Sequence, residues 1–298
     1  MAEPAPRSRR RRGSVSGEEA FGSLVDFARK DANVVGLILS GSRGAGAQNR
    51  FSDYDVKVIV KDGTIERYRR RRIFKGPGLD VHLLDVRGFA QHAKIGTALE
   101  WDAFSFSHSR VLVDKTGRIA WIAGSKARIP ASVRRPYVAR FLDEYINAVY
   151  RSLKAFRMGE SLAGHLEATQ SIPPLLSTVF GLEGRFRPYA KYLRWELEHR
   201  PLGTLPVPSA EFVRDIRKVL RSGSPATQRA IYRWMERSLR RQGYGRVFDR
   251  WGPTTLRFLK EGTQDAIEPG SSLIVGPRGR GPRRTDRRGR PRVSAPHR

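Results

Sequence analysis

The chain has 298 residues, of which 39% are hydrophobic, and a formal net charge of +28 at pH 7. This is enough apolar material for one large or two ordinary domains, which excludes a small disulfide-stapled fold, and the absence of cysteine excludes a thiolate nucleophile or a cysteine-based zinc site. No apolar run approaches the roughly 18 residues that a membrane span needs, and polar residues follow the basic N-terminus where a signal peptide would be apolar, so we expect a cytoplasmic protein.

The positive charge is spread over the body of the chain as well as its ends. Residues 1–13 carry +4 and residues 271–298 carry +8, which leaves +16 for the remainder. A field of this sign attracts phosphate-bearing molecules, including nucleotides and nucleic acids. Solvated arginines without a binding role would give the same total, so the charge alone does not choose between the two interpretations.

The predicted elements begin with an amphipathic helix over residues 17–30, where apolar side chains recur at three- and four-residue steps. A continuous apolar run at residues 34–40 (VVGLILS) predicts a buried strand. The alternating segments at residues 54–60 (YDVKVIV) and 79–86 (LDVHLLDV) predict two more strands, and residues 111–113 predict a last short one. This order of elements predicts a mixed α/β (α+β) domain.

The rest of the chain is predicted to be helical. Helical spacing recurs in five stretches separated by Gly and Pro: residues 137–157, 161–180, 189–199, 210–220 and 227–241. From about residue 270 the chain is Gly, Pro and Arg with few apolar side chains, which predicts disorder. The expected organisation is a disordered basic arm (1–16), a catalytic α/β domain (17–125), an all-helical domain (126–268) that faces the substrates, and a disordered tail (269–298).

The segment SGSRGAGAQNRFSDYDVKVIV, residues 40–60, carries the chemistry. A strand leads into Gly41 and Ser42, where the missing Cβ of Gly41 lets backbone amides approach a triphosphate and the Ser42 hydroxyl can add a hydrogen bond. Asp53 and Asp55 stand two residues apart at the start of the next strand, so both carboxylates lie on one face. Such a pair is suited to Mg²⁺, which is usually bound by one or two carboxylates together with substrate phosphates.

This combination resembles the signature of the DNA polymerase β-like nucleotidyltransferase superfamily, and GSRGAG followed by SDYDVKVIV looks most like its aminoglycoside-type and small bacterial members. The resemblance covers residues 18–125. It implies a two-metal Mg²⁺ site completed by a third carboxylate on a neighbouring strand. Asp80 is the matching position because it directly follows a Gly-Pro-Gly turn, whereas the alternative, Asp85, would lie on the opposite face. The implied reaction moves a nucleoside monophosphate, most often AMP from ATP, onto a hydroxyl.

The resemblance also suggests further contacts with the substrates. The helical segment 177–197 is similar to the part of the aminoglycoside-type enzymes that faces the nucleotide, and Lys191 is the triphosphate contact that this implies; an ordinary surface lysine is the alternative. Arg43 is either a phosphate contact or a solvated loop arginine. Some relatives use a Glu as general base, for which Glu100 and Glu167 are both candidates. His82 is expected to be a buried strand histidine without a catalytic role.

The sequence does not identify the molecule that accepts the nucleoside monophosphate. The basic body argues against a cationic aminoglycoside, so a small molecule, an RNA or a protein remain as hydroxyl acceptors. The alternative function is a catalytically weak protein of the same fold that binds nucleic acid nonspecifically through residues 67–72 and its basic ends.

Overall fold

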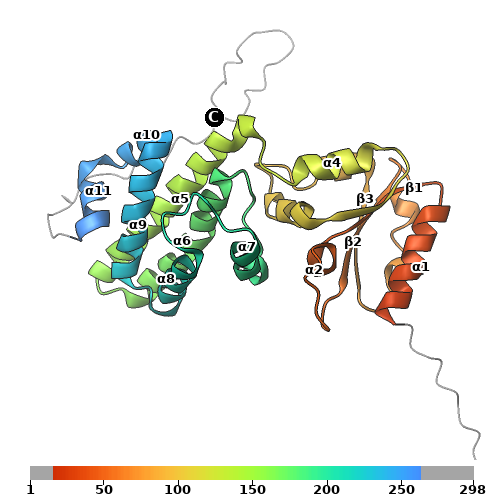
Figure 1. Cartoon of the computed structure of the whole chain (residues 1–298), viewed down its shortest axis with the longest axis horizontal. Coiled ribbons are helices and arrows are strands. Elements are labelled where there is room, and N and C mark those ends of the chain that lie inside the picture. Colours follow the sequence, from red (N-terminus) through yellow and green to blue (C-terminus); the bar gives the residue numbers. More distant parts are fainter. Residues whose placement is uncertain (1–15, 263–298) are drawn as a thin grey trace, which may run out of the picture. The chain divides into compact units, whose positions relative to one another are not determined.

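The computed structural model describes residues 16–262, which all belong to one compact unit. A four-stranded mixed sheet occupies the first part of the chain and helices the rest, so the predicted fold class is confirmed (Figure 1). The predicted division into a catalytic and a helical domain at residue 125 stays a prediction. The basic arm and tail fall almost entirely outside the described residues.

The sheet has the strand order β3-β2-β1-β4. Its strands are β1 (Val34–Leu39), β2 (Tyr54–Val60), β3 (Leu79–Asp85) and β4 (Arg110–Asp114). β1 pairs with β2 and β4 in antiparallel fashion, whereas β2 and β3 are parallel. Each strand lies within about two residues of its predicted position.

One face of the sheet is apolar and is covered by helix α1 (Gly17–Lys30). Ser16 and Glu19 form a reciprocal capping box at the start of α1, which fixes where the helix begins. Leu24 and Ala28 of α1 are fully buried against alternate side chains of β2, namely Tyr54, Val56, Val58 and Val60. Because side chains alternate along a strand, the intervening residues of β2, including Asp55, face the other side of the sheet.

That second face is covered by short elements that connect and follow the strands. A single helical turn, α2 (Gly41–Gly44), links β1 to the loop before β2, where the sequence predicted only a loop. Helix α3 (Val86–Gln91), the 3₁₀ segment η3 (Glu100–His108) and helix α4 (Arg118–Lys126) follow. Phe89, Phe106 and Ile119 from these elements are buried.

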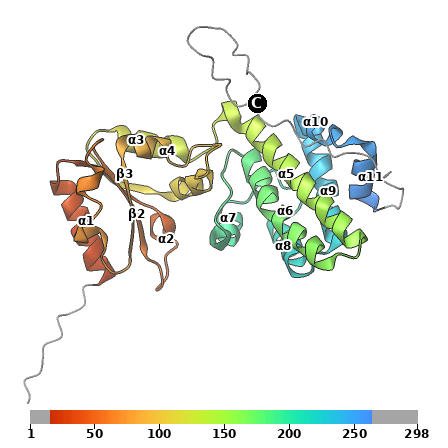
Figure 2. The same cartoon turned by 180° about the vertical axis from the view of Figure 1, so that it is seen from behind.

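The helical part is built on two long helices that lie side by side in both views, α5 (Ala131–Arg157) and α6 (Ser161–Leu182) (Figures 1 and 2). Up to residue 262, five further α-helices follow: α7 (Leu193–His199), α8 (Ser209–Ser222), α9 (Pro225–Leu239), α10 (Gly245–Asp249) and α11 (Gly252–Glu261). The π-helical turn η5 (Arg240–Tyr244) joins α9 to α10. The predicted helix at 189–199 is instead the 3₁₀ turn η4 (Ala190–Tyr192) followed by α7, and α10 and α11 were not predicted. Within residues 16–262, no helix is both long and apolar enough to cross a membrane.

Candidate active site

The strand register brings three predicted carboxylates to one corner of the sheet. Asp55 of β2 is the register partner of Asp80 of β3, and Asp53 immediately precedes β2. Burial raises the pKa of the Asp55 carboxyl, and the negative charges of Asp53 and Asp80 raise it further, although Lys191 and Lys57 act in the opposite direction. The structure therefore places Asp53, Asp55 and Asp80 in electrostatic contact.

Asp85, the alternative third carboxylate, lies at the far end of β3. It pairs in register with Val60, and its side chain caps α3 by accepting a hydrogen bond from the Gly88 amide at 2.7 Å. Capping of α3 explains why an acid stands at the end of β3. Asp85 lies at the opposite end of this strand from Asp80 and is therefore not part of the group formed by Asp53, Asp55 and Asp80.

Gly41 lies directly against the carboxylate of Asp55. Its φ of +63° is in the left-handed region, and a Cβ at this position would be 1.7 Å from Oδ2 of Asp55. The Ser40 amide and hydroxyl donate to the Asp55 carbonyl at 2.8 and 3.1 Å, which ties the loop to the strand. The first amides of α2 have no carbonyl partner within the helix, and Ser42 beside them is buried.

A second row of polar residues adjoins the acids on the same face. Two residues beyond Asp55 and Asp80 come Lys57 and His82, which are again register partners. Lys57 is buried, with its Nζ 3.1 Å from the Ser105 hydroxyl and 3.3 Å from the Asp102 carboxylate. His82 is exposed and lies edge-on to His92, so the prediction of a buried histidine was wrong.

Asp102 of η3 joins this row to the helical part of the chain. Its carboxylate accepts hydrogen bonds from His92 and from the hydroxyl of Tyr189, besides its ion pair with Lys57. Although burial acts to raise the pKa of Asp102, these partners hold it well below its usual range. Asp102 is thus a buried, ionised link between β2 and the segment that carries Lys191.

The two candidate phosphate-binding cations differ in their surroundings. Lys191 is exposed in η4, two residues after Tyr189, and its charge lowers the pKa of Asp55. Arg43 instead donates from Nε and Nη2 to the Ser52 carbonyl at 3.2 and 3.0 Å and stacks 3.9 Å from the ring centre of Tyr54. These contacts brace the loop before β2, whereas the ammonium group of Lys191 lies 5.0 Å from the ring centre of Tyr192 and has no ion pair within residues 16–262.

Both candidate general bases are engaged in ion pairs. Glu100 pairs with Arg140 and accepts a hydrogen bond from the Gly96 amide, and Glu167 pairs with Arg151. Each side chain is less than one-sixth exposed. The choice between them stays open.

The acid corner fits a magnesium ion in its chemistry. Carboxylate oxygens are the hard donors that Mg²⁺ prefers, and the mutual repulsion that raises the pKa of Asp55 is relieved by a bound cation. Among residues 16–262, no three His, Asp or Glu side chains form a ready-made metal shell. Mg²⁺ commonly takes one or two carboxylates plus substrate phosphates, so this arrangement suits an ion that arrives with a nucleotide.

An aromatic pocket adjoins Gly41 on the side of the helical part. Its rings are those of Phe104, His108, Tyr189, Tyr192 and Trp195. The hydroxyl of Tyr192 is buried and has no hydrogen-bond partner among the residues that the structure describes. The pocket is narrow, about 10 Å³, so a flat ligand would have to part its walls.

We expect Asp55→Asn to make the folded protein more stable at pH 7. Because the pKa of Asp55 is raised, ionisation of this carboxyl destabilises the folded state. The destabilisation is absent below the unfolded pKa of about 3.9, grows as the pH rises from there to the folded pKa, and is fully present above it. Thermal unfolding should therefore show a higher midpoint for the variant at pH 7 and a smaller difference at pH 4. A lower midpoint at pH 7 would contradict this electrostatic interpretation.

No protein-family model matches the sequence, and no curated protein is significantly similar to it. Solved structures do match, among them the crystal structure of a nucleotidyltransferase-like protein from Exiguobacterium sibiricum 255-15. The sequences are 12% identical, the match covers 82% of this chain and 87% of the other, and the TM-score is 0.42. A likeness this remote carries no conclusion about activity, which has to be argued from the residues of the site.

Proposed function

We propose that this chain is a metal-dependent nucleotidyltransferase that moves a nucleoside monophosphate, AMP from ATP, onto a hydroxyl acceptor and releases pyrophosphate. The observation that carries the proposal is the grouping of Asp53 and Asp80 around Asp55, whose carboxylate lies directly against Gly41. The carboxylates would repel the triphosphate that the neighbouring turn would bind, unless cations lie between the carboxylates and the phosphates. Their close association is therefore suited to a nucleotide that is bound with Mg²⁺.

In this reaction the acceptor oxygen forms a bond to the α-phosphorus, and the bond from that phosphorus to its bridging oxygen breaks. Pyrophosphate departs with the electron pair, and the acceptor proton passes to a base or to solvent. Asp53, Asp55 and Asp80 would hold two Mg²⁺ ions, which supply charge neutralisation for the phosphates and a lowered pKa for the acceptor hydroxyl. The protein itself contributes mainly position and charge.

Three features would position the nucleotide. The amides of Gly41, Ser42 and Arg43 at the turn would donate to the phosphate oxygens, and the ammonium group of Lys191 would neutralise the outer phosphates. The aromatic pocket beside Gly41 would accept the base, because every nucleobase can stack on such rings. This last contact requires the pocket to open.

The acceptor would be neutral or anionic. The remainder of the chain between the basic ends carries +16, which opposes the approach of a polycationic aminoglycoside and favours a phosphate-bearing small molecule, an RNA or an acidic protein surface.

The alternative, a nucleic-acid-binding scaffold, gains no specific support from the described residues. Within the basic run at residues 67–72, Arg69 pairs with Glu66, and Arg71 stacks over the rings of Phe27 and Tyr68. Arg69 and Arg71 are therefore engaged in contacts within the protein itself. The basic ends lie outside the described part of the chain.

The proposal is tested by nucleotide binding and pyrophosphate release with each of the four ribonucleoside triphosphates, with and without Mg²⁺. We expect Asp53→Ala/Asp55→Ala to reduce Mg²⁺-dependent turnover by at least about 10²-fold, because charge placed at the reacting phosphates is usually worth that much. The charge-matched control is Asp26→Ala/Glu66→Ala, which removes two exposed acids elsewhere. Equal behaviour of the native protein and the Asp53→Ala/Asp55→Ala variant would overturn the proposal.

A further inference from the structure

A second cavity, of about 90 Å³, lies in the same part of the molecule as the aromatic pocket and shares Phe104 with it. Its apolar lining is Ala127 and the buried rings of Phe104 and Phe186. Its polar lining is formed by Ser107, Arg128, Arg185, Glu196 and Arg200. None of these charged side chains belongs to the acid corner or to the predicted phosphate loop.

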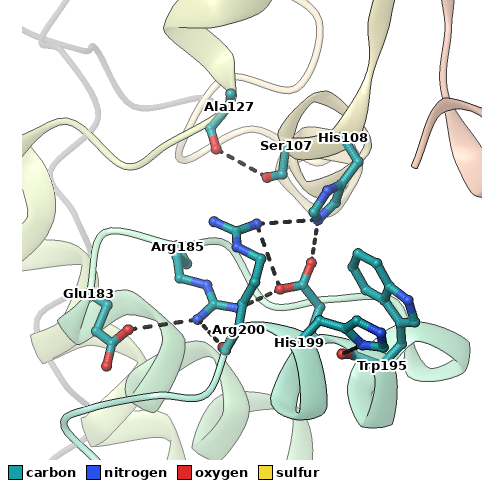
Figure 3. A network of polar contacts seen from close by, with 9 residues as sticks. Ser107, His108, Ala127, Glu183, Arg185, Trp195, His199 and Arg200 are labelled. Atoms are coloured by element: carbon teal, nitrogen blue, oxygen red, sulfur yellow. Dashed lines mark hydrogen bonds and ion pairs between the residues drawn. The ribbon is translucent and has the colours of Figure 1, made fainter. Parts of the chain in front are cut away.

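The carboxylate in this cavity, that of Glu196, already has partners that balance its negative charge. Glu196 is 1% exposed, and its oxygens contact His108, Arg185 and, at 3.8 Å, Arg200 (Figure 3). Although burial acts to raise the pKa of Glu196, the hydrogen bonds and charges of His108 and Arg185 lower it. Glu196 is therefore ionised, and its negative charge is shared between Arg185 and Arg200.

The guanidinium groups around the cavity outnumber the acids near it. Arg185 also has Glu183 at 3.7 Å and donates from Nη1 to the Arg200 carbonyl at 2.8 Å. Within the described part of the chain, the guanidinium group of Arg200 makes only the long contact with Glu196 and a 3.4 Å contact with His108. Arg128 is exposed and has no ion pair with any residue of the described range 16–262. The cavity thus has a surplus of positive charge.

We propose that this cavity binds a small oxyanion of the phosphate class. Guanidinium groups present planar pairs of N–H donors that match phosphate oxygens, and Arg128 and Arg200 have donors left over for that purpose. The volume corresponds to about three water molecules at ~30 Å³ each, which is the right order for one phosphate group. This site goes beyond the proposed function and does not depend on it.

Two sources can supply the oxyanion: free inorganic phosphate, or a phosphate group attached to a larger molecule. Titrating the full chain with inorganic phosphate and, separately, with glycerol phosphate distinguishes them. Binding of both identifies a site that is open to phosphate monoesters, whereas binding of inorganic phosphate alone identifies a closed site for the free ion.

The experiment is calorimetric titration at low chloride with four proteins. We expect native protein to bind inorganic phosphate at one saturable site, and Arg128→Gln to weaken this binding about tenfold, because a charge-assisted hydrogen bond is lost. Ala127→Leu, which fills the cavity from its wall without changing any charge, should weaken it at least as much. Arg217→Gln, an equal loss of charge at an exposed helix position without ion pairs in residues 16–262, should leave binding within twofold.

Two results would overturn the proposal that this cavity binds phosphate. One is the absence of saturable phosphate binding to the native protein. The other is an equal weakening by Arg128→Gln and Arg217→Gln together with no effect of Ala127→Leu, because diffuse attraction to a basic protein has that signature. Circular dichroism of each variant verifies that it is folded, and Arg128 is chosen because no ion pair depends on it.

Discussion

Asp102→Asn is expected to lower the free energy of unfolding by about 3–5 kcal/mol, the usual cost of removing one partner from a buried ion pair. The substitution keeps the size of the side chain and a carbonyl oxygen for the Tyr189 hydroxyl. It leaves Lys57, which is only 5% exposed, without an ion pair in the part of the chain that the structure describes. Urea unfolding followed by circular dichroism measures the loss.

Two control proteins separate this effect from a general loss of charge. Lys57→Met/Asp102→Asn removes both members of the pair, so most of the lost stability should return. Glu66→Gln breaks the exposed pair with Arg69 and should cost less than about 1 kcal/mol. If Asp102→Asn cost no more than Glu66→Gln, Asp102 would not be the buried anchor that its contacts indicate.

The sequence was sufficient to predict the strands and the acid pair because both depend on short-range patterns. Alternation in YDVKVIV predicted a strand with one polar face, and Asp53 and Asp55 followed from the period of two. The turn before β3 favoured Asp80 over Asp85 as the third carboxylate, and the role of Asp80 as a metal ligand stays a prediction. The parallel register that places Asp80 opposite Asp55 adds the physical reason for it.

The polar contacts of Asp102 could not be predicted from the sequence, because they join residues that are far apart in the chain. Asp102 contacts Lys57, 45 positions earlier, and Tyr189, 87 positions later. One local signal was present: Lys57 interrupts an otherwise apolar strand at the same two-residue step as Asp55, and a lysine on a buried face needs a partner. The identity of that partner depends on the tertiary fold.

Gly41→Ala is expected to slow the proposed nucleotide transfer by about 10²-fold while the protein remains folded. A Cβ at Gly41 would lie 1.7 Å from Oδ2 of Asp55, so the carboxylate or the turn has to move by more than an ångström. A displacement of about 1 Å in positioning groups can cost roughly 10²-fold in rate. Mg²⁺-dependent pyrophosphate release and nucleotide binding are the measurements, with thermal unfolding alongside.

Gly46→Ala provides the matched control, because Gly46 lies in the same loop with a φ of +70° and a Cβ there would meet nothing within 4 Å. Both substitutions force alanine into the left-handed region at a cost of about 1–2 kcal/mol, so this backbone cost is common to the two variants. Only Gly41→Ala also displaces Asp55. If the two variants lost activity equally, backbone strain in the loop would explain the loss; if only Gly41→Ala lost activity, the contact between the turn and the Asp55 carboxylate would be the feature that the reaction requires.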